Sequence, residues 1–301
     1  MTEPYKSAAA VESAIRDAAR NAFAADKSMS TQDRIRQEYF RRFLSRIFSE
    51  RDDSDWLLKG GTGVLARVAS GRRTTDIDLF RANNTLDGAL AELIRLASID
   101  LDDFFRFVYT RHRSVVGGDR QTYTEGYGVD FDVYIGVDKK EPLHVDLVVG
   151  VIVTDEVTVT PPANRLDLPR LPSNDYRLYP TVDQIADKVC ATMADYSGRR
   201  SSREKDLVDL VVIAKTQTVS ADTLGRAIDA EARVRSLKPF TELTIPAAWG
   251  RLYAKEAKDV PHCADYRTAD LAGELMRAYI DPVLRGEVPG KIWSPESAAW
   301  G

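Results

Sequence analysis

The sequence predicts an α/β protein whose first half supplies most of the strands and whose second half is helical. Apolar and polar residues alternate along residues 104–150, which is the period of a β-strand. From residue 181 onward the apolar residues recur at helical spacing. The hydrophobic fraction of 44% and the charged fraction of 29% are ordinary for a globular chain. The length of 301 residues suits two domains or one large one.

The first half begins with two helices and continues with strands. The alanine-rich segment 6–25 carries apolar residues on one helical face, and a second helix starts near Ser30 and Thr31. A strand near 56–59, a strand near 76–80 and a helix over 85–97 follow. Further strands are predicted at 104–110, 121–128, 130–137 and 143–150.

The second half reads as a helical lobe. Residues 157–180 hold five prolines and predict a linker or crossover strap between two lobes. We expect a first domain over 1–160 and a helical C-terminal domain over 161–301. Helices are predicted at 181–196, 202–216, 220–236 and 265–285. The tail after Pro289 is expected to be a loosely held extension.

Charge and composition narrow the function classes. The net charge of −4 does not indicate a nucleic-acid binder, so any RNA contact must come from local basic patches. The two cysteines form no metal or disulfide framework and fit a reducing compartment. No run of about 18 apolar residues and no signal-like N-terminus occur. We expect a cytoplasmic protein without membrane association.

The motif with the clearest chemistry is Gly60-Gly61-Thr62 followed by Asp76-x-Asp78. Carboxylates at alternate positions of a strand share one face and can bridge two Mg²⁺ ions. A glycine turn at a helix start leaves backbone N–H groups that bind phosphates. A lone Asp-x-Asp is more often a solvated turn, but the preceding turn and the apolar Ile77 and Leu79 favour the functional interpretation. The combination suggests nucleotidyl transfer.

This motif resembles the first motif of the DNA-polymerase-β-like nucleotidyltransferases. Further segments occur in the order seen in the AbiEii/AbiGii toxin family, which includes the mycobacterial MenT nucleotidyltransferase toxins. These segments are Lys59-Gly-Gly-Thr, Arg73-x-x-Asp-Ile-Asp-Leu, His144-Val-Asp-Leu-Val-Val-Gly, Tyr179-Pro, Asp187-Lys188 and Lys205-Asp-Leu-Val-Asp-Leu. The resemblance covers residues 55 to 213 and implies a mixed twisted sheet with a helical C-terminal lobe.

The resemblance also implies roles for single residues. Asp76 and Asp78 would be catalytic metal ligands, and Lys59 with Gly60, Gly61 and Thr62 would bind the nucleotide. A third metal carboxylate is expected on a neighbouring strand. Asp146 is the first choice, and Asp130 and Asp132 are the alternatives.

Two residues of the predicted helical lobe complete the expected catalytic set. Lys188 would contact the triphosphate, although a helix lysine is usually a surface residue. Asp206, in Asp206-Leu-Val-Asp209, would support the site by orienting a lysine or the nucleotide. An ordinary salt-bridged helix surface is the simpler interpretation of that pair.

A basic run, Arg199, Arg200 and Arg203 with Lys205, is the predicted RNA-binding segment. Arg67, Arg72 and Arg73 could line the same groove. Each of these residues alone is more often part of a solvated loop. The three histidines are scattered and form no zinc pattern.

The expected activity is that of a type IV-like toxin. It would use two Mg²⁺ ions to transfer a nucleotide monophosphate from an NTP to RNA, at the 3′ end of tRNA, and a cognate antitoxin would restrain it. The alternatives are a small-molecule transferase of the aminoglycoside nucleotidyltransferase kind, and an inactive scaffold that binds a nucleotide or an antitoxin.

Overall fold

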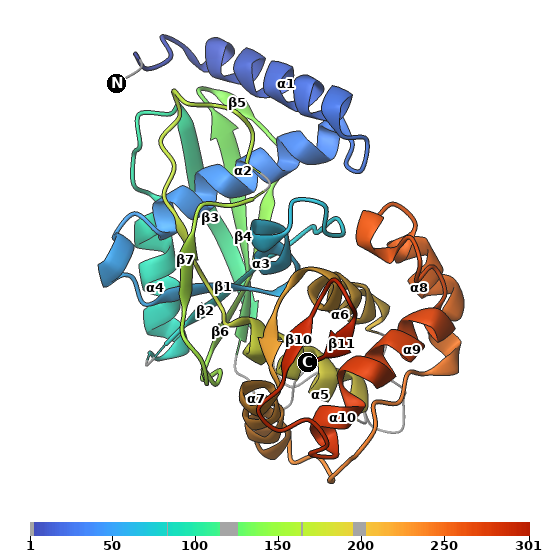
Figure 1. Ribbon diagram of the computed structural model, residues 1–301. Helices are drawn as coiled ribbons and strands as arrows, with labels where there is room; N and C mark the ends of the chain where they lie inside the picture. Colours follow the sequence, from blue (N-terminus) through green and yellow to red (C-terminus); the bar gives the residue numbers. More distant parts are fainter. Residues whose placement is uncertain (1–2, 83, 115–125, 164, 195–202) are drawn as a thin grey trace.

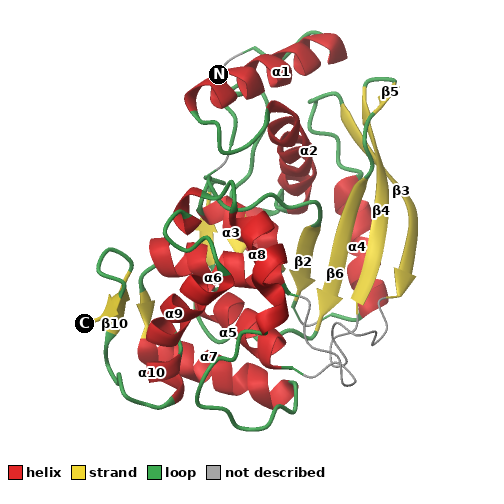
Figure 2. Cartoon of the chain, turned by 90° about the vertical axis from the view of Figure 1, so that its right-hand side faces the viewer, coloured by secondary structure: helices red, strands yellow, loops and turns green. Residues whose placement is uncertain are grey.

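A computed structural model describes residues 3–82, 84–114, 126–163, 165–194 and 203–301. It places a mixed sheet beside a helical lobe, with the second helix lying across the sheet and the first packed against the second (Figures 1 and 2). The predicted α/β class and mixed sheet are confirmed. No helix in the described ranges is both long and apolar enough to cross a bilayer.

The sheet follows the order β3-β4-β6-β2-β1-β8-β7, and β5 pairs with β4. Its strands are β1 (Trp56–Lys59), β2 (Ile77–Arg81), β3 (Phe105–Ser114), β4 (Gly126–Ile135), β5 (Asp138–Lys139), β6 (Leu143–Val149), β7 (Thr158–Thr160) and β8 (Tyr176–Leu178). β2 pairs with β6 and β1 with β8 in parallel, and the other pairs are antiparallel.

One face of the sheet is covered by apolar contacts with helices. The N-terminal helices are α1 (Ala8–Ala25), α2 (Thr31–Ile47), α3 (Gly60–Arg67) and α4 (Leu86–Ala97). Phe43 of α2 is fully buried, and its ring centroid lies 5.2 Å from that of Phe107 and 5.1 Å from that of Phe131. Every second residue of β2, β4 and β6 joins this core. The intervening polar residues therefore line the opposite face of the sheet.

The helical lobe is built around a buried helix. Its helices are α5 (Thr181–Met193), α6 (Glu204–Thr216), α7 (Ala221–Val234), α8 (Gly250–Ala257), α9 (Ala269–Tyr279) and α10 (Asp281–Leu284). Residues 206–214 of α6 are all buried, so this helix is surrounded by its neighbours. The six residues Leu207, Val208, Leu210, Val211, Val212 and Ile213 contribute to a second hydrophobic core.

Three sequence expectations about strands and helices were wrong. The strands predicted at 121–128 and 130–137 are one strand, β4, within the described residues, because the burial alternation continues through residue 130. The helix predicted at 265–285 is divided between α9 and α10, where Pro282 lacks the N–H that a continuous helix needs. The segment 157–180 is not only a connection, because it contributes β7 and β8 to the sheet.

The C-terminal tail is also more firmly held than expected. Residues after Pro289 form the strands β10 (Ile292–Ser294) and β11 (Ala299–Trp300), and β10 pairs with β9 (Val219–Ser220). Trp293 is fully buried, and its Nε1 donates a hydrogen bond of 2.7 Å to the carbonyl of Ala214. Burying an indole stabilises the hairpin against the lobe, and a sequence without strand alternation does not show this.

Candidate active site

Asp78 lies at the centre of the sheet, on the face that the helices α2 and α4 leave uncovered. It stands opposite Lys59 of β1 on one side and opposite Asp146 of β6 on the other. Residues that are paired in this way direct their side chains to the same face. Two of the three predicted metal carboxylates, which come from distant parts of the sequence, are thus neighbours.

The glycine turn is fitted closely around Asp78. Gly60 begins α3 with a φ of +61°, which residues with a Cβ rarely adopt. A Cβ atom at this position would overlap the carboxylate of Asp78. The glycine is therefore needed for two reasons, its backbone conformation and the close approach of the carboxylate.

Asp76 lies in the bend that leads into β2, one residue before the strand begins. Its carbonyl accepts a hydrogen bond of 2.7 Å from the hydroxyl of Thr62, which is buried. Its carboxylate accepts a bond of 3.2 Å from the hydroxyl of Thr75. Thr62, predicted to bind the nucleotide, thus holds the backbone of Asp76 in place.

The negative charges of Asp78 and Asp146 repel each other. Burial and the negative charge of Asp146 raise the pKa of Asp78 to about 7, although the charges of Lys59 and Lys188 oppose this shift. A divalent cation at this place would relieve the repulsion and favour the charged form of Asp78. Carboxylate oxygens are also the ligands that Mg²⁺ prefers. The chemical type of the donors therefore fits a magnesium site.

The carboxylates of the described residues do not by themselves form a complete set of metal ligands. Within the described ranges, no three His, Cys, Asp or Glu side chains converge closely enough to hold a metal ion. Mg²⁺ usually takes only one or two carboxylates and completes its shell with waters and substrate phosphates. The observed set suits an ion that arrives with a nucleotide.

The two alternative third carboxylates have other partners. Asp130 accepts from Nδ1 of His144 at 2.7 Å and pairs with Arg111 at 2.8 Å. Asp132 pairs with Lys139 at 2.7 Å. Only Asp146, among the three candidates, stands opposite Asp78. The geometry therefore favours Asp146.

His144 connects these carboxylates. Its Nε2 lies 3.1 Å from Oδ1 of Asp146, and its Nδ1 faces Asp130. The hydrogen bond to Asp146 and then that to Asp130 raise the pKa of His144 to about 9, against the effect of burial. The imidazole is consequently charged at neutral pH and donates from both nitrogens.

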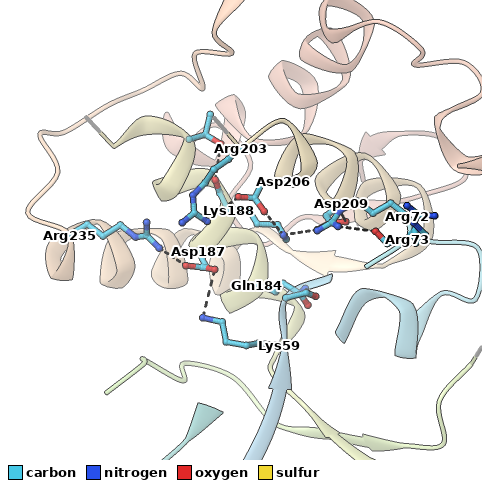
Figure 3. Close-up of polar contacts among 12 residues, drawn as sticks. Lys59, Arg72, Arg73, Gln184, Asp187, Lys188, Arg203, Asp206, Asp209 and Arg235 are labelled. Atoms are coloured by element: carbon cyan, nitrogen blue, oxygen red, sulfur yellow. Dashed lines mark hydrogen bonds and ion pairs between the residues drawn. The ribbon is translucent and has the colours of Figure 1, made fainter. Parts of the chain in front are cut away.

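Lys59 is enclosed between the sheet and α5. Its ammonium lies 3.9 Å from Asp187 and 5.6 Å from the centre of the Tyr179 ring. Asp187 also forms an ion pair with Arg235 (Figure 3). Although burial opposes the charge, Lys59 and Arg235 hold the pKa of Asp187 well below its usual range. The predicted nucleotide lysine is therefore fixed in position by an acidic residue of the helical lobe.

Lys188 is buried between two carboxylates of the helical lobe. Its Nζ donates to Asp206 at 2.7 Å and to Asp209 at 2.8 Å (Figure 3). Burial disfavours the ammonium, but the two carboxylates raise the pKa of Lys188 above its usual value. Asp209 also pairs with Arg72 at 2.9 Å, and Arg203 pairs with Asp206 at 3.2 Å. The pair of acidic residues at i and i+3 on α6 is therefore not a solvated surface, and both carboxylates accept hydrogen bonds from Lys188.

Several residues of this region were not singled out as site residues from the sequence. Gln184 donates a bond of 2.7 Å to the carbonyl of Gly60, which ties α5 to the glycine turn. With Asp187 and Lys188 it occupies positions i, i+3 and i+4 of a helix whose other face is apolar. This polar stripe on an otherwise apolar helix is a sequence pattern that could have identified Gln184 as a site residue. Arg72 was predicted only as a possible lining residue of the RNA groove, and its pairing with Asp209 has no sequence signal, because only the fold brings the two together.

The predicted RNA-binding arginines are only partly described. Arg199 and Arg200 lie outside the described residues. Arg203 precedes α6, and its guanidinium faces Asp206 rather than a groove. Arg67 also has partners within the protein, because it donates hydrogen bonds to the carbonyl of Tyr179 and to the side chain of Gln184. Arg73 pairs with Asp33 at 3.1 Å and is exposed, as is Lys205.

Three solved structures are similar to this chain over most of its length. The nucleotidyltransferase toxin MenT4 from Mycobacterium tuberculosis aligns over 90% of this chain and 98% of its own, with 17% identity and a TM-score of 0.50. A candidate nucleotidyltransferase from Helicobacter pylori aligns over 86% and 99%, with 15% identity and a TM-score of 0.48. JHP933 from Helicobacter pylori aligns over 86% and 96%, with 14% identity and a TM-score of 0.42.

Among curated proteins, none matches the chain significantly. The model of one protein family, described as the nucleotidyl transferase AbiEii toxin of type IV toxin–antitoxin systems, matches residues 42–272. This range spans most of the chain and includes every strand of the large sheet together with Lys59, Asp78, Asp146 and Lys188. The protein therefore belongs to the AbiEii family of nucleotidyl transferase toxins.

Proposed function

We propose that the protein is a Mg²⁺-dependent toxin that transfers a nucleotide monophosphate from an NTP to RNA, at the 3′ end of tRNA. One observation carries the proposal. Asp78 and Asp146 stand opposite each other on neighbouring strands, directly beside a glycine turn at a helix start. Paired carboxylates and free backbone N–H groups are what a metal-bound triphosphate requires. Family membership implies a cognate antitoxin as the partner.

In this proposal the carboxylates bind the metal, and the glycine turn and the lysines bind the phosphates. Asp78 and Asp146, with Asp76 beside them, would hold Mg²⁺, which lowers the pKa of a bound hydroxyl and neutralises phosphate charge. The N–H groups of the Gly60–Gly61 turn and the ammonium of Lys59 would bind the triphosphate. Asp187 fixes Lys59, and Asp206 and Asp209 keep Lys188 charged close to Asp78.

The transfer itself exchanges one phosphorus–oxygen bond for another. The oxygen of an acceptor hydroxyl bonds to the α-phosphorus, and the bond between the α-phosphorus and the bridging oxygen breaks. Pyrophosphate leaves, and the hydroxyl proton passes to solvent. The positive charges of Lys59 and Lys188 stabilise the charge that develops on pyrophosphate.

The test is labelling of RNA. Purified protein is incubated with total RNA, Mg²⁺ and each α-labelled NTP, alongside Asp78→Asn and a sample with EDTA. We expect label in the tRNA fraction with the unmodified protein alone. A folded protein that labels no RNA would overturn the proposal, and transfer to a small hydroxylated compound would replace it with the small-molecule alternative.

A further inference from the structure

One row of the sheet runs from the nucleotide end of the site to an exposed arginine. Lys59, Asp78, Asp146, Gly128 and Arg113 stand opposite one another on β1, β2, β6, β4 and β3. Since neighbouring strands lie about 4.8 Å apart, the Cα atoms of Asp146 and Arg113 are separated by about 10 Å. Lys59 is covered by α5, whereas β3 is the edge strand and Arg113 is exposed.

A β-bulge directs Arg113 toward this face. The pairing of β3 with β4 shifts between Tyr109 and Arg111. Before the shift, Arg106 faces Tyr134 and its guanidinium lies 4.4 Å from the ring centre. Without an extra residue, the strand would continue this alternation and point residues 111 and 113 to the opposite face. The bulge inverts the alternation, so the two arginines lie on the side of Asp130 and Asp146.

Gly128 leaves room for the side chain of Arg113 beside His144. A Cβ atom at Gly128 would lie 3.0 Å from Cε1 of His144 and 3.3 Å from Nε of Arg113. Nε of Arg113 therefore lies beside Gly128, where a side chain is missing, and near the imidazole that binds Asp146. Any larger residue at position 128 would force the two side chains apart.

The charge of Arg113 is available to a ligand. Arg111, two residues earlier, forms an ion pair with Asp130, which also binds His144. Among the residues that the structure describes, Arg113 has no ion pair or hydrogen bond to a carboxylate. An exposed guanidinium that is directed at a metal-type site is suited to a phosphate, which it binds through two parallel hydrogen bonds.

We propose that Arg113 binds a backbone phosphate of the acceptor RNA, adjacent to the nucleotide whose hydroxyl reacts at Asp146. This inference rests on the proposed function. It assigns the two ends of the row to the two substrates, with Lys59 at the NTP and Arg113 at the RNA. Arg111 pairs with Asp130, which binds His144, which in turn binds Asp146. This chain of contacts holds the edge strand in register with Asp146.

The experiment separates the two substrates kinetically. Arg113→Gln and Arg113→Lys are compared with the unmodified protein for transfer to deacylated tRNA, with tRNA and NTP varied in turn. Arg106→Gln is the matched control, because it removes an arginine from the same strand and face but at a distance of about 20 Å along the strand. Thermal unfolding of each variant checks that the fold is intact.

We expect Arg113→Gln to raise the KM for tRNA at least tenfold and to leave the KM for NTP within twofold. Arg113→Lys should recover only part of the loss, since it restores the charge but not the two parallel hydrogen bonds. Losing one phosphate contact should reduce the slope of log Kd for tRNA against log salt by about one. Arg106→Gln should change neither quantity.

An unchanged KM for tRNA in Arg113→Gln would overturn the inference, and so would an increase in the KM for NTP instead. An equal effect of Arg106→Gln would also overturn it, because the contact would then be general attraction to a basic strand. A failure of the proposed function is distinguishable, since the unmodified protein itself would then transfer no nucleotide to RNA.

Discussion

The carboxylate of Asp78, the second residue of β2, lies so close to Gly60, the first residue of α3, that a Cβ atom on the glycine would overlap it. The contact joins the predicted phosphate turn to the predicted metal ligand. A side chain added at the turn should therefore displace the carboxylate.

Replacing Gly60 with alanine should abolish nucleotide transfer and destabilise the fold. The left-handed φ of +61° costs about 1–2 kcal/mol for a residue with a Cβ, and the overlap with Asp78 adds to this. Gly286→Ala is the control, because Gly286 has a φ of +66° with no atom within 4 Å of the added Cβ. It should show the backbone cost alone in urea unfolding and retain full activity. Equal stability losses in the two variants would contradict the contact with Asp78.

The stability of the metal-free protein should depend on the ionisation of Asp78. Burial and Asp146 raise its pKa from an ordinary value near 3.8 to about 7, so the folded state binds its proton more tightly than the unfolded state. The stabilisation from this group is complete below pH 4 and is lost as the pH rises to 7. Asp78→Asn should therefore flatten this part of the pH profile and be more stable than the unmodified protein at pH 8.

Magnesium should reverse this behaviour. Mg²⁺ with an NTP should raise the melting temperature of the unmodified protein at pH 8, because binding to the folded state favours it. The same addition should leave Asp78→Asn nearly unchanged. Equal shifts in both proteins would place the metal elsewhere.

Asp209 should be a major stabilising residue of the helical lobe. It is fully buried and accepts from both Lys188 and Arg72, so Asp209→Asn leaves two buried cations without their shared charge. A cost of about 3–5 kcal/mol in unfolding free energy is expected. The comparison is Asp55→Asn, which breaks the more exposed pair with Arg81 and should cost at most about 1 kcal/mol. Similar costs for the two changes would show that the buried group carries little stability.

The C-terminal hairpin should be needed for a stable lobe. Trp293→Ala removes a fully buried indole and its hydrogen bond to Ala214, and a loss of about 3–5 kcal/mol is expected. Ile292, the preceding residue of the same strand, is 44% exposed, and its change to alanine should cost less than about 1 kcal/mol. Chemical denaturation of both variants measures the difference. A mild effect of Trp293→Ala would restore the view of the tail as a loose extension.

The sequence by itself determined the local elements and the order of the motifs. The strand predicted at 56–59 is β1, and the helix predicted at 85–97 is α4 within one residue, because alternation and helical spacing are local properties of the chain. The order of the motifs from Lys59 to Asp209 was enough to identify the family that residues 42–272 match.

Only the tertiary structure decided which of these residues meet. The parallel pairing of β2 with β6 places Asp146 opposite Asp78, and a one-residue change of register would have turned it to the other face. The bulge that directs Arg113, the burial of Asp209 and the docking of Trp293 are likewise results of contacts between distant segments. Such contacts depend on the packing of the whole chain, in which a charged or aromatic residue has the same sequence signature on the surface as in the core.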